Sequence, residues 1–325
     1  MLLSRIADSL YWMSRYLERV DSTARLVEIN VIHLLEADRA VSEAAEWKPL
    51  LAICSTEAVY EKAFGTSEVT SSRVIQFLLR ERANPGSARQ SLRLARENAR
   101  AVRDRISREM WECVNDLYLR HQERLARPLQ PERAADHCRF LRSEVARFHG
   151  HTSSTMMRGE AFGFYLLGFF LERADMTARI MDVKYHLLLP DLSLVGSALD
   201  YYQWAALLKS MSGFEAYRRR YASLLPQNIA EFVILDGDFP RSLRFAVDRM
   251  AQALETIGSA RADSPSAAAI AALADLLGVH TGGSLFESGL HEFLESFVDG
   301  VSKLHGALQQ EYFEAHLGDA AACGT

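Results

Sequence analysis

The sequence lacks an apolar run long enough to cross a membrane. Its longest apolar stretch lies near Phe162–Leu171 and is followed at once by Glu172 and Arg173, whereas a transmembrane helix needs about 20 apolar residues. The first residues, MLLSRIADSLYW, include Arg5 and Asp8 and lack the apolar segment of a signal peptide. We therefore predict a cytoplasmic protein that does not associate with a membrane.

The sequence has few cysteines and no net positive charge. The four cysteines form neither a CxxC pair nor a zinc-binding spacing, so we expect reduced structural thiols. They are Cys54, Cys113, Cys138 and Cys323. The formal net charge of −5 gives no reason to expect nucleic acid as a partner of the whole protein.

Proline is also rare, and strand patterns are missing. The eight prolines lie between segments whose apolar residues recur every three or four positions, which is helical spacing. No segment shows strict alternation bounded by turn pairs, so we expect no strands and an all-α fold. The pattern predicts helices over 4–36, 47–63, 71–81, 88–106, 108–126, 132–148, 161–188, 197–211, 214–223, 226–235, 242–257, 264–277 and 285–316.

One segment of the chain occurs twice. Residues 17–25, LERVDSTAR, recur as 171–179, LERADMTAR, with seven of nine positions identical. Weaker echoes follow in the same order: Trp47 and Trp204, Tyr60 and Tyr217, Phe77 and Phe232, and Ser91-Leu92-Arg93 and Ser242-Leu243-Arg244. A repeat this long is not that of a solenoid. We predict a multi-helix bundle of two pseudo-symmetric, duplicated halves, residues 1–158 and 159–325, packed as one compact unit.

The repeated segment places charged residues beside an apolar helix face. They are Glu18, Arg19, Asp21 and Arg25 in the first copy and Glu172, Arg173, Asp175 and Arg179 in the second. The pattern favours a partly buried carboxylate–guanidinium lattice, in which Glu18 would lie near Arg173 or Arg179, and Glu172 near Arg19 or Arg25. A pocket for an anionic or zwitterionic ligand, such as a peptide terminus, and a two-metal carboxylate site are the alternatives.

A second candidate site is rich in arginine. Between Arg80 and Arg127 the sequence has twelve arginines and seven acidic residues, which suits an anion or an acidic partner as well as a solvated helix with ion pairs. The possible anion-binding residues are Arg96, Asn98, Arg100, Arg103, Asn115 and Arg158.

No complete catalytic or metal-binding pattern is present. The pair His149 and His151 is separated by Gly150 and has no carboxylate nearby in sequence, and the single His291-Glu292 lacks the second histidine of a zinc-protease helix. We therefore predict no metal and no cofactor, and the sequence leaves open whether the protein is an enzyme.

Several of these motifs resemble the alpha-E family, a predicted helical domain named for its ER motif. They are the Glu-Arg pairs at 18–19 and 172–173, Asn84-Pro85-Gly86-Ser87 followed by Arg96–Asp104, Trp111-Glu112-x-x-Asn115, and Thr155-Met156-x-Arg158. The resemblance covers roughly the whole chain. It implies a bacterial cytoplasmic protein whose genes often lie beside those of circularly permuted ATP-grasp ligases, transglutaminase-like peptidases and a proteasome-like peptidase.

The resemblance therefore leads us to expect an accessory or binding protein that acts with an ATP-grasp peptide ligase in peptide synthesis or modification. The expected partners are that ligase, a transglutaminase-like protein and possibly a peptide ligand. The alternative is an enzyme that acts on peptides through an Arg- and Glu-lined cleft between the two helical halves.

Overall fold

The computed structural model describes residues 2–36, 43–65, 69–188, 198–258, 264–287 and 289–314, and helices are the regular structure found in these ranges. The helices are α1 Ser4–Glu36, α2 Glu43–Ile53, α3 Glu57–Phe64, α4 Ser71–Leu79, α5 Ala88–Ala101, α6 Arg108–Arg124, α7 Pro131–Thr155, α8 Glu160–Leu188, α9 Ala198–Ser210, α10 Phe214–Arg220, α11 Pro226–Ala230, α12 Leu243–Ile257, α13 Pro265–Gly278, α14 Gly282–Glu287 and α15 Leu290–Leu308. Two π-helical turns, Glu231–Leu235 and Gln309–Phe313, extend α11 and α15. No helix in these ranges is long and apolar enough to cross a membrane.

The chain divides into two compact units. Unit 1 comprises Met1–Arg15, Met156–Asp182 and Glu215–Thr325, and unit 2 comprises Tyr16–Thr155 and Val183–Phe214. The division passes through α1 and through α8, so each of these helices contributes residues to both units. The boundary between duplicated halves near residue 158 concerns the origin of the sequence, and it stays a prediction.

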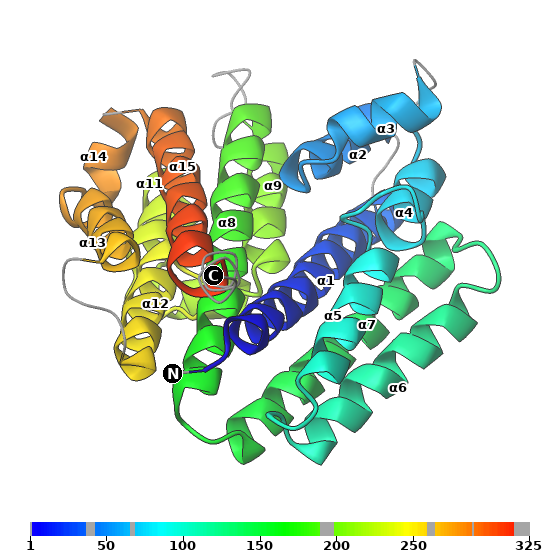
Figure 1. The fold of residues 1–325 in the computed structure, drawn as a ribbon. Helices are drawn as coiled ribbons and strands as arrows, with labels where there is room; N and C mark the ends of the chain where they lie inside the picture. Colours follow the sequence, from blue (N-terminus) through cyan, green and yellow to red (C-terminus); the bar gives the residue numbers. More distant parts are fainter. Residues whose placement is uncertain are drawn as a thin grey trace, which may run out of the picture. The chain divides into compact units, whose positions relative to one another are not determined.

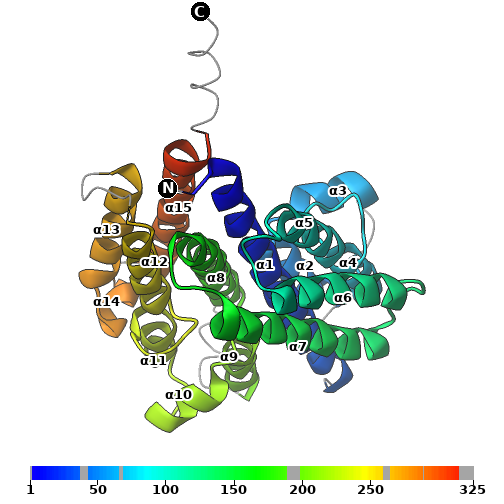
Figure 2. The same ribbon diagram turned by 60° about the horizontal axis from the view of Figure 1, so that its bottom comes forward.

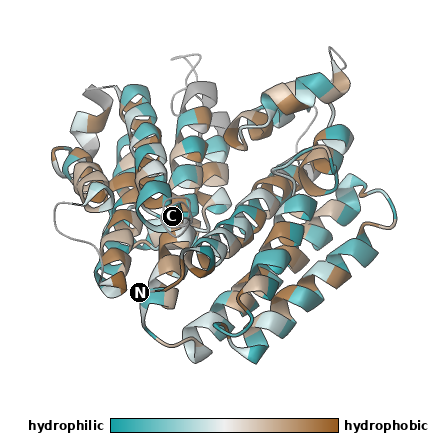
Figure 3. Cartoon of the chain, viewed as in Figure 1, coloured by the Kyte–Doolittle hydropathy of each residue, from teal (hydrophilic) through white to brown (hydrophobic). Residues whose placement is uncertain are grey.

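In unit 2, α5, α6 and α7 run side by side (Figure 1). Their facing positions are apolar and fully buried, as Leu92, Leu117 and Leu141 show. Each helix carries both hydrophobic and hydrophilic residues around its circumference (Figure 3), which is the pattern of a helix that packs on one face. Ser87 and Ser107 begin α5 and α6 by accepting hydrogen bonds from Gln90 and Met110 backbone N–H groups.

In unit 1, α13 packs against both α12 and α15, and the three helices form one group in Figure 2. The close contact of α13 with α15 depends on Gly300, because a Cβ atom there would lie 2.6 Å from a methyl carbon of Leu273. Ser242 and Ser264 cap α12 and α13 in the same way as Ser87 caps α5.

The first part of α1 and α8 approach each other within unit 1 at Gly168. A Cβ atom at this position would lie 2.2 Å from the carbonyl oxygen of Tyr11 and 2.4 Å from Oγ of Ser14. Only glycine leaves room for this approach of the two backbones, and the approach sets the neighbourhood of the second Glu-Arg motif.

Several sequence predictions of helix limits were wrong. The helix predicted over 88–106 ends at Ala101. The helix predicted over 47–63 is broken between α2 and α3 at Ser55, whose φ is +53°, and no glycine or proline signals this turn. The helix predicted to end at 148 continues to Thr155 with Gly150 inside it, because glycine weakens a helix without ending it. The helix predicted over 285–316 is interrupted before Leu290, next to Gly289 with φ of +91°; residues 315 and 316 lie outside the described residues.

Candidate functional site

The α8 copy of the repeated motif holds a buried ion pair with an arginine outside the repeat. Arg15 donates from Nε to Oε2 of Glu172 at 2.8 Å. The Glu172 residue is 1% exposed and Arg15 is 8% exposed. Burial by itself would lower the pKa of Arg15, but the charges of Tyr11 and Glu172 outweigh burial and raise it. The guanidinium is therefore permanently charged.

The ion pair continues into a chain of hydrogen bonds that ends at a partly exposed histidine. Arg15 donates from a terminal nitrogen to the hydroxyl oxygen of Tyr11 at 3.3 Å, and that oxygen lies 2.8 Å from Nδ1 of His305 on α15. Tyr11 lies one helical turn before Arg15 and is fully buried. The His305 ring stacks on Tyr11 and meets Trp12 edge to face, with centroids 5.7 and 5.4 Å apart.

The surroundings of His305 keep its imidazole neutral. The contact with the Tyr11 hydroxyl fits either neutral tautomer, because that oxygen can donate to Nδ1 or accept from both Arg15 and Nδ1–H. Burial, followed by the charge of Arg15, lowers the pKa of His305 to about 4. Burial also raises the pKa of Tyr11 to about 12. Both groups are therefore neutral at pH 7.

The other charged and polar residues of the α8 copy hold a loop of unit 1 in place. Arg173 donates to the carbonyl of Pro240 at 3.2 Å, and Thr177 donates to that of Arg241 at 3.1 Å. These carbonyls precede the cap of α12. The Arg173 guanidinium also lies 4.1 Å from the centroid of the Phe169 ring. In this copy, one motif arginine thus joins α8 to the start of another helix.

The α1 copy of the motif lies in unit 2 and is more deeply enclosed. Glu18 is 0% exposed, and its Oε2 lies 3.8 Å from Nε2 of His149 on α7. The Arg19 guanidinium lies 5.7 Å from the centroid of the Tyr16 ring. Gly150, which follows His149, lies within a continuous helix, so His149 reaches Glu18 from an intact helical face.

Both copies contain an i,i+4 ion pair between the motif aspartate and the motif's last arginine. In α1 the Asp21–Arg25 distance is 2.7 Å, with side chains 7% and 8% exposed, and Arg25 also donates to the Ser212 hydroxyl. In α8 the Asp175–Arg179 distance is 2.9 Å, with side chains 18% and 30% exposed. The same pair is thus buried in one copy and partly solvated in the other.

The structure does not test the pairings expected between the two copies. Glu18 belongs to unit 2, whereas Arg173 and Arg179 belong to unit 1. The converse pairing joins Glu172 of unit 1 with Arg19 or Arg25 of unit 2. These pairings, and the role of the eight motif residues as a lattice or a pocket, stay predictions.

The expected anion-binding residues fall on two different units. Arg96 donates to Oδ1 of Asn115 at 2.8 Å on the α5–α6 face of unit 2, and it contacts Glu97 at 3.1 Å. Asn98 and Asn115 are half-buried on that side, and Arg100 and Arg103 are exposed. Arg100 pairs with Glu97 at 2.6 Å. Arg158 lies in unit 1, where its guanidinium covers the Phe162 ring at 4.0 Å.

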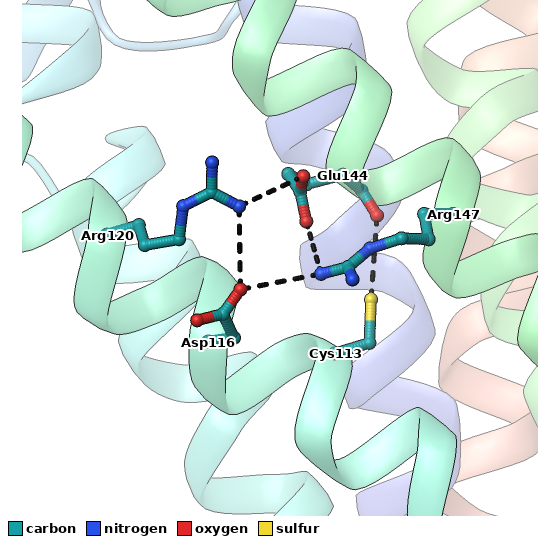
Figure 4. A network of polar contacts seen from close by, with 5 residues as sticks. All are labelled: Cys113, Asp116, Arg120, Glu144 and Arg147. Atoms are coloured by element: carbon teal, nitrogen blue, oxygen red, sulfur yellow. Dashed lines mark hydrogen bonds and ion pairs between the residues drawn. The ribbon is translucent and has the colours of Figure 1, made fainter.

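A further polar network joins α6 and α7 (Figure 4). Arg120 contacts Asp116 at 3.5 Å and Glu144 at 3.3 Å, and Arg147 contacts the same two carboxylates. Cys113 donates from Sγ to the Glu144 carbonyl at 3.8 Å. Burial raises the pKa of the Cys113 thiol to about 11, so the sulfur is protonated and a poor nucleophile at pH 7.

Two buried histidines face each other between α6 and α7. His137 Nε2 lies 3.0 Å from His121 Nδ1, and the residues are 2% and 0% exposed. Burial lowers the pKa of His137 to about 4 and, with the neighbouring His137, lowers that of His121 well below its ordinary value. Both rings are therefore neutral at pH 7.

Among the residues that the structure describes, no three His, Cys, Asp or Glu side chains gather as metal ligands. The absence of a metal stays a prediction.

The sequence pattern missed the partners of the motif carboxylates. Arg15 lies just before the first repeat, and its position one helical turn before Arg19 was the one sequence feature that indicated a place on the charged stripe. His305 is 294 residues from Tyr11. Glu28, which binds Arg142 of α7, continues the charged stripe of α1 at three residues beyond Arg25.

Comparison with protein families gives one match. The profile of Alpha-E, described as "a predicted alpha-helical domain with a conserved ER motif", matches residues 2–313 of the 325 residues. The chain therefore belongs to the Alpha-E family. Neither the comparison with curated proteins nor that with solved structures gave a match.

Proposed function

We propose that this Alpha-E chain is a non-catalytic accessory or binding module that acts with an ATP-grasp peptide ligase in peptide synthesis or modification. The observation that carries the non-catalytic part is the burial of the motif carboxylates. Glu18 and Glu172 are 0% and 1% exposed, and Glu172 is neutralised by Arg15. A general acid or base must come within hydrogen-bonding reach of its substrate, and these carboxylates have no such access.

The role of the motif in this proposal is to fix the relative positions of helices within each unit. Arg15–Glu172 joins α1 to α8, Arg173 joins α8 to the loop before α12, and Glu18 approaches α7. Buried ion pairs add little net stability, but removing one partner is costly. Such pairs suit a scaffold that presents its surfaces to a partner.

The proposal of the ligase as a partner rests on the resemblance of the motifs to the family. The proposals of a transglutaminase-like partner and of a bacterial, cytoplasmic setting rest on the same resemblance. The test is affinity purification of the full-length chain co-expressed with the ATP-grasp ligase encoded beside it, followed by a ligase assay with and without the chain. We expect co-elution and a change in ligation rate on addition of the chain. Failure to associate, together with unchanged ligation, contradicts the proposal.

A peptide-directed enzyme is the second candidate, and one observation favours it. His305 is a partly exposed, neutral imidazole at the end of a chain of buried groups, and it is held there by its contact with Tyr11. Histidine oriented in this way can serve as an acid–base group. Incubation of peptides with the wild-type chain and with His305→Gln distinguishes the candidates: turnover that His305→Gln abolishes supports an enzyme, and absence of turnover in both supports the accessory module.

We further infer that the two halves, residues 1–158 and 159–325, arose by duplication and are pseudo-symmetric. Two turns support this inference. Ser55 and Ser212 are the non-glycine residues with positive φ in the described ranges, at +53° and +51°. Each turn has the same two backbone hydrogen bonds, Ser55 to Ala52 and Thr56 to Leu51, and Ser212 to Lys209 and Gly213 to Leu208.

Two helix starts give similar support. Ser87 and Ser242 each cap a helix, and each donates its hydroxyl to the carbonyl six residues earlier, in Glu81 and Asp236. This pattern supports a pairing of Ser87 with Ser242 in place of the pairing of Ser91 with Ser242 that the sequence suggested. An insertion or deletion in one repeat changes which residues correspond, so a short sequence match can pair the wrong positions.

Buried aromatic pairs also recur. Tyr60 meets Phe77 at 5.1 Å and 88°, and Tyr217 meets Phe232 at 5.6 Å and 81°. An experimental structure in which residues 47–87 and 204–242 fail to superimpose contradicts the duplication.

A further inference from the structure

The charge of this acidic protein is unevenly distributed. Residues 80–105 contain eight arginines and three acidic residues, whereas the whole chain has a net charge of −5. The arginines lie on α5 and on the segments that flank it. A local excess of positive charge on a negative protein attracts the acidic groups of a partner.

Two of these side chains, Arg96 and Arg103, alternate with aromatic rings of α6. The Arg103 guanidinium lies 5.1 Å from the centroid of Trp111, and the Arg96 guanidinium lies 5.9 Å from Trp111 and 5.0 Å from Tyr118. On α5, Arg89 precedes Arg96 by seven residues, and on α6, Trp111 precedes Tyr118 by the same interval. Seven residues are two helical turns, or about 10 Å.

Two arginines of this face are not neutralised by a carboxylate within the described structure. Glu97 pairs with Arg96 and Arg100, but neither Arg89 nor Arg103 forms an ion pair with a described carboxylate. Burial, together with the charges of Arg82 and Arg80, lowers the pKa of Arg89. An anion placed here would relieve this repulsion.

We propose that the α5–α6 face formed by Arg89, Arg96, Arg103, Trp111 and Tyr118 is a docking surface for an acidic segment of a partner protein. The segment carries carboxylates about 10 Å apart, as on a helix with Glu at every seventh position. At Arg96 and Arg103 the carboxylate meets the N–H edge of a guanidinium that is held against an aromatic ring.

The geometry favours a peptide over a nucleic acid. Single-stranded nucleic acids are held by stacking of bases on aromatic rings, but the described faces of Trp111 and Tyr118 are covered by arginines. Arg89 and Arg96, about 10 Å apart along α5, are also too far apart for a single phosphate group. This surface stands independently of the proposed role with a ligase.

The test measures binding of a fluorescent helical peptide of about 20 residues with Glu at every seventh position to the full-length chain by anisotropy. We expect binding that weakens as salt screens the charges. Arg96→Gln should weaken it about tenfold, which is the effect of losing about 1.4 kcal/mol. Arg103→Lys keeps the charge but loses the planar stack, so we expect about threefold weaker binding.

The matched control is Arg133→Gln, the same loss of charge at an exposed position on α7, which should change binding less than about twofold. Far-UV circular dichroism and melting of each variant establish that it is folded. The proposal is overturned if the peptide does not bind at low salt, or if Arg133→Gln weakens binding as much as Arg96→Gln. Tighter binding of a single-stranded oligonucleotide, of ATP or of a second copy of the chain likewise overturns it by assigning another occupant.

Discussion

The two copies of the Glu-Arg motif have nearly the same sequence but different surroundings. In α8, Glu172 binds Arg15, a cation at every accessible pH, and the contact leads through Tyr11 to a partly exposed histidine. In α1, Glu18 is fully enclosed and approaches His149, which is charged only when protonated. The motif thus sets where a carboxylate is buried, while residues outside the motif decide what faces it.

The last part of the motif, by contrast, forms the same ion pair in both copies. Asp21–Arg25 and Asp175–Arg179 are formed by the motif itself, one helical turn apart. Here the difference lies in burial, because the α1 pair is enclosed and the α8 pair is partly solvated. Two copies of a sequence motif can therefore form the same ion pair, while the contribution of that pair to stability differs between them.

The largest expected effect concerns Glu172. Glu172→Gln leaves Arg15 buried without its carboxylate, so we expect a loss of about 3–5 kcal/mol in the free energy of unfolding, measured by urea denaturation. Glu255→Gln, the same change at an exposed position of α12 in the same unit, should cost less than about 0.5 kcal/mol.

A double-mutant cycle shows whether the loss of stability in Glu172→Gln arises from its ion pair with Arg15. Arg15→Met combined with Glu172→Gln should lose at least about 1 kcal/mol less than the sum of the single changes. Additive losses would mean that Glu172 is stabilised mainly by other groups, and the contrast between the two copies would then not rest on Arg15.

The next effect is a loss of stability in acid, to which His305 of unit 1 and His137 of unit 2 both contribute. The folded pKa of His137 is about 4, and in the unfolded chain it is about 6.5. The unfolded state therefore binds the extra proton as pH falls from about 6.5 towards 4, and stability falls over this range by about 2–3 kcal/mol for His137. Urea midpoints measured across this range should fall less steeply in His137→Gln than in the wild type; equal slopes contradict the assignment.

The two aspartate pairs should differ in cost. Asp21→Asn removes the carboxylate from a buried arginine, and we expect a loss of about 1–3 kcal/mol, whereas Asp175→Asn removes a partly solvated pair and should cost about 0–1 kcal/mol. Both variants can be compared in one urea series at pH 7. Equal losses would show that the difference in burial has no energetic consequence.

The smallest effect is expected in the network of Figure 4. The side chains of Asp116, Arg120 and Arg147 are about half exposed, so solvent screens their interactions. Asp116→Asn should change the unfolding free energy by less than about 1 kcal/mol, and thermal melting in low and high salt should show little difference from the wild type. A loss as large as that of Glu172→Gln would remove the distinction between buried and exposed networks.

The sequence predicted helices well where one pattern runs without interruption. The limits of α1 were predicted at Ser4 and Glu36, because its apolar residues keep helical spacing throughout. The break at Ser55 was missed since serine usually avoids positive φ. Gly150 was taken for an interruption, yet neighbouring turns of α7 keep that residue helical.

The candidate site was predictable only in part. Repetition identified Glu172 and Asp175, and helical spacing indicated that charges border a buried face. The identity of the facing groups depends on packing between segments far apart in the chain, as for Tyr11 and His305. The aromatic rings stacked on Arg96 and Arg103 were equally hidden, because the register between α5 and α6 is set by their tertiary contact.

The turns at Ser55 and Ser212 offer different opportunities for raising heat tolerance. Asparagine adopts positive φ more readily than serine, so Ser55→Asn should release backbone strain and raise the melting temperature by about 1–2 °C. At the other turn, the Ser212 hydroxyl accepts a hydrogen bond from Arg25, and its replacement would sacrifice that contact. A designer seeking a thermostable version of this chain should therefore change the first turn and keep the second.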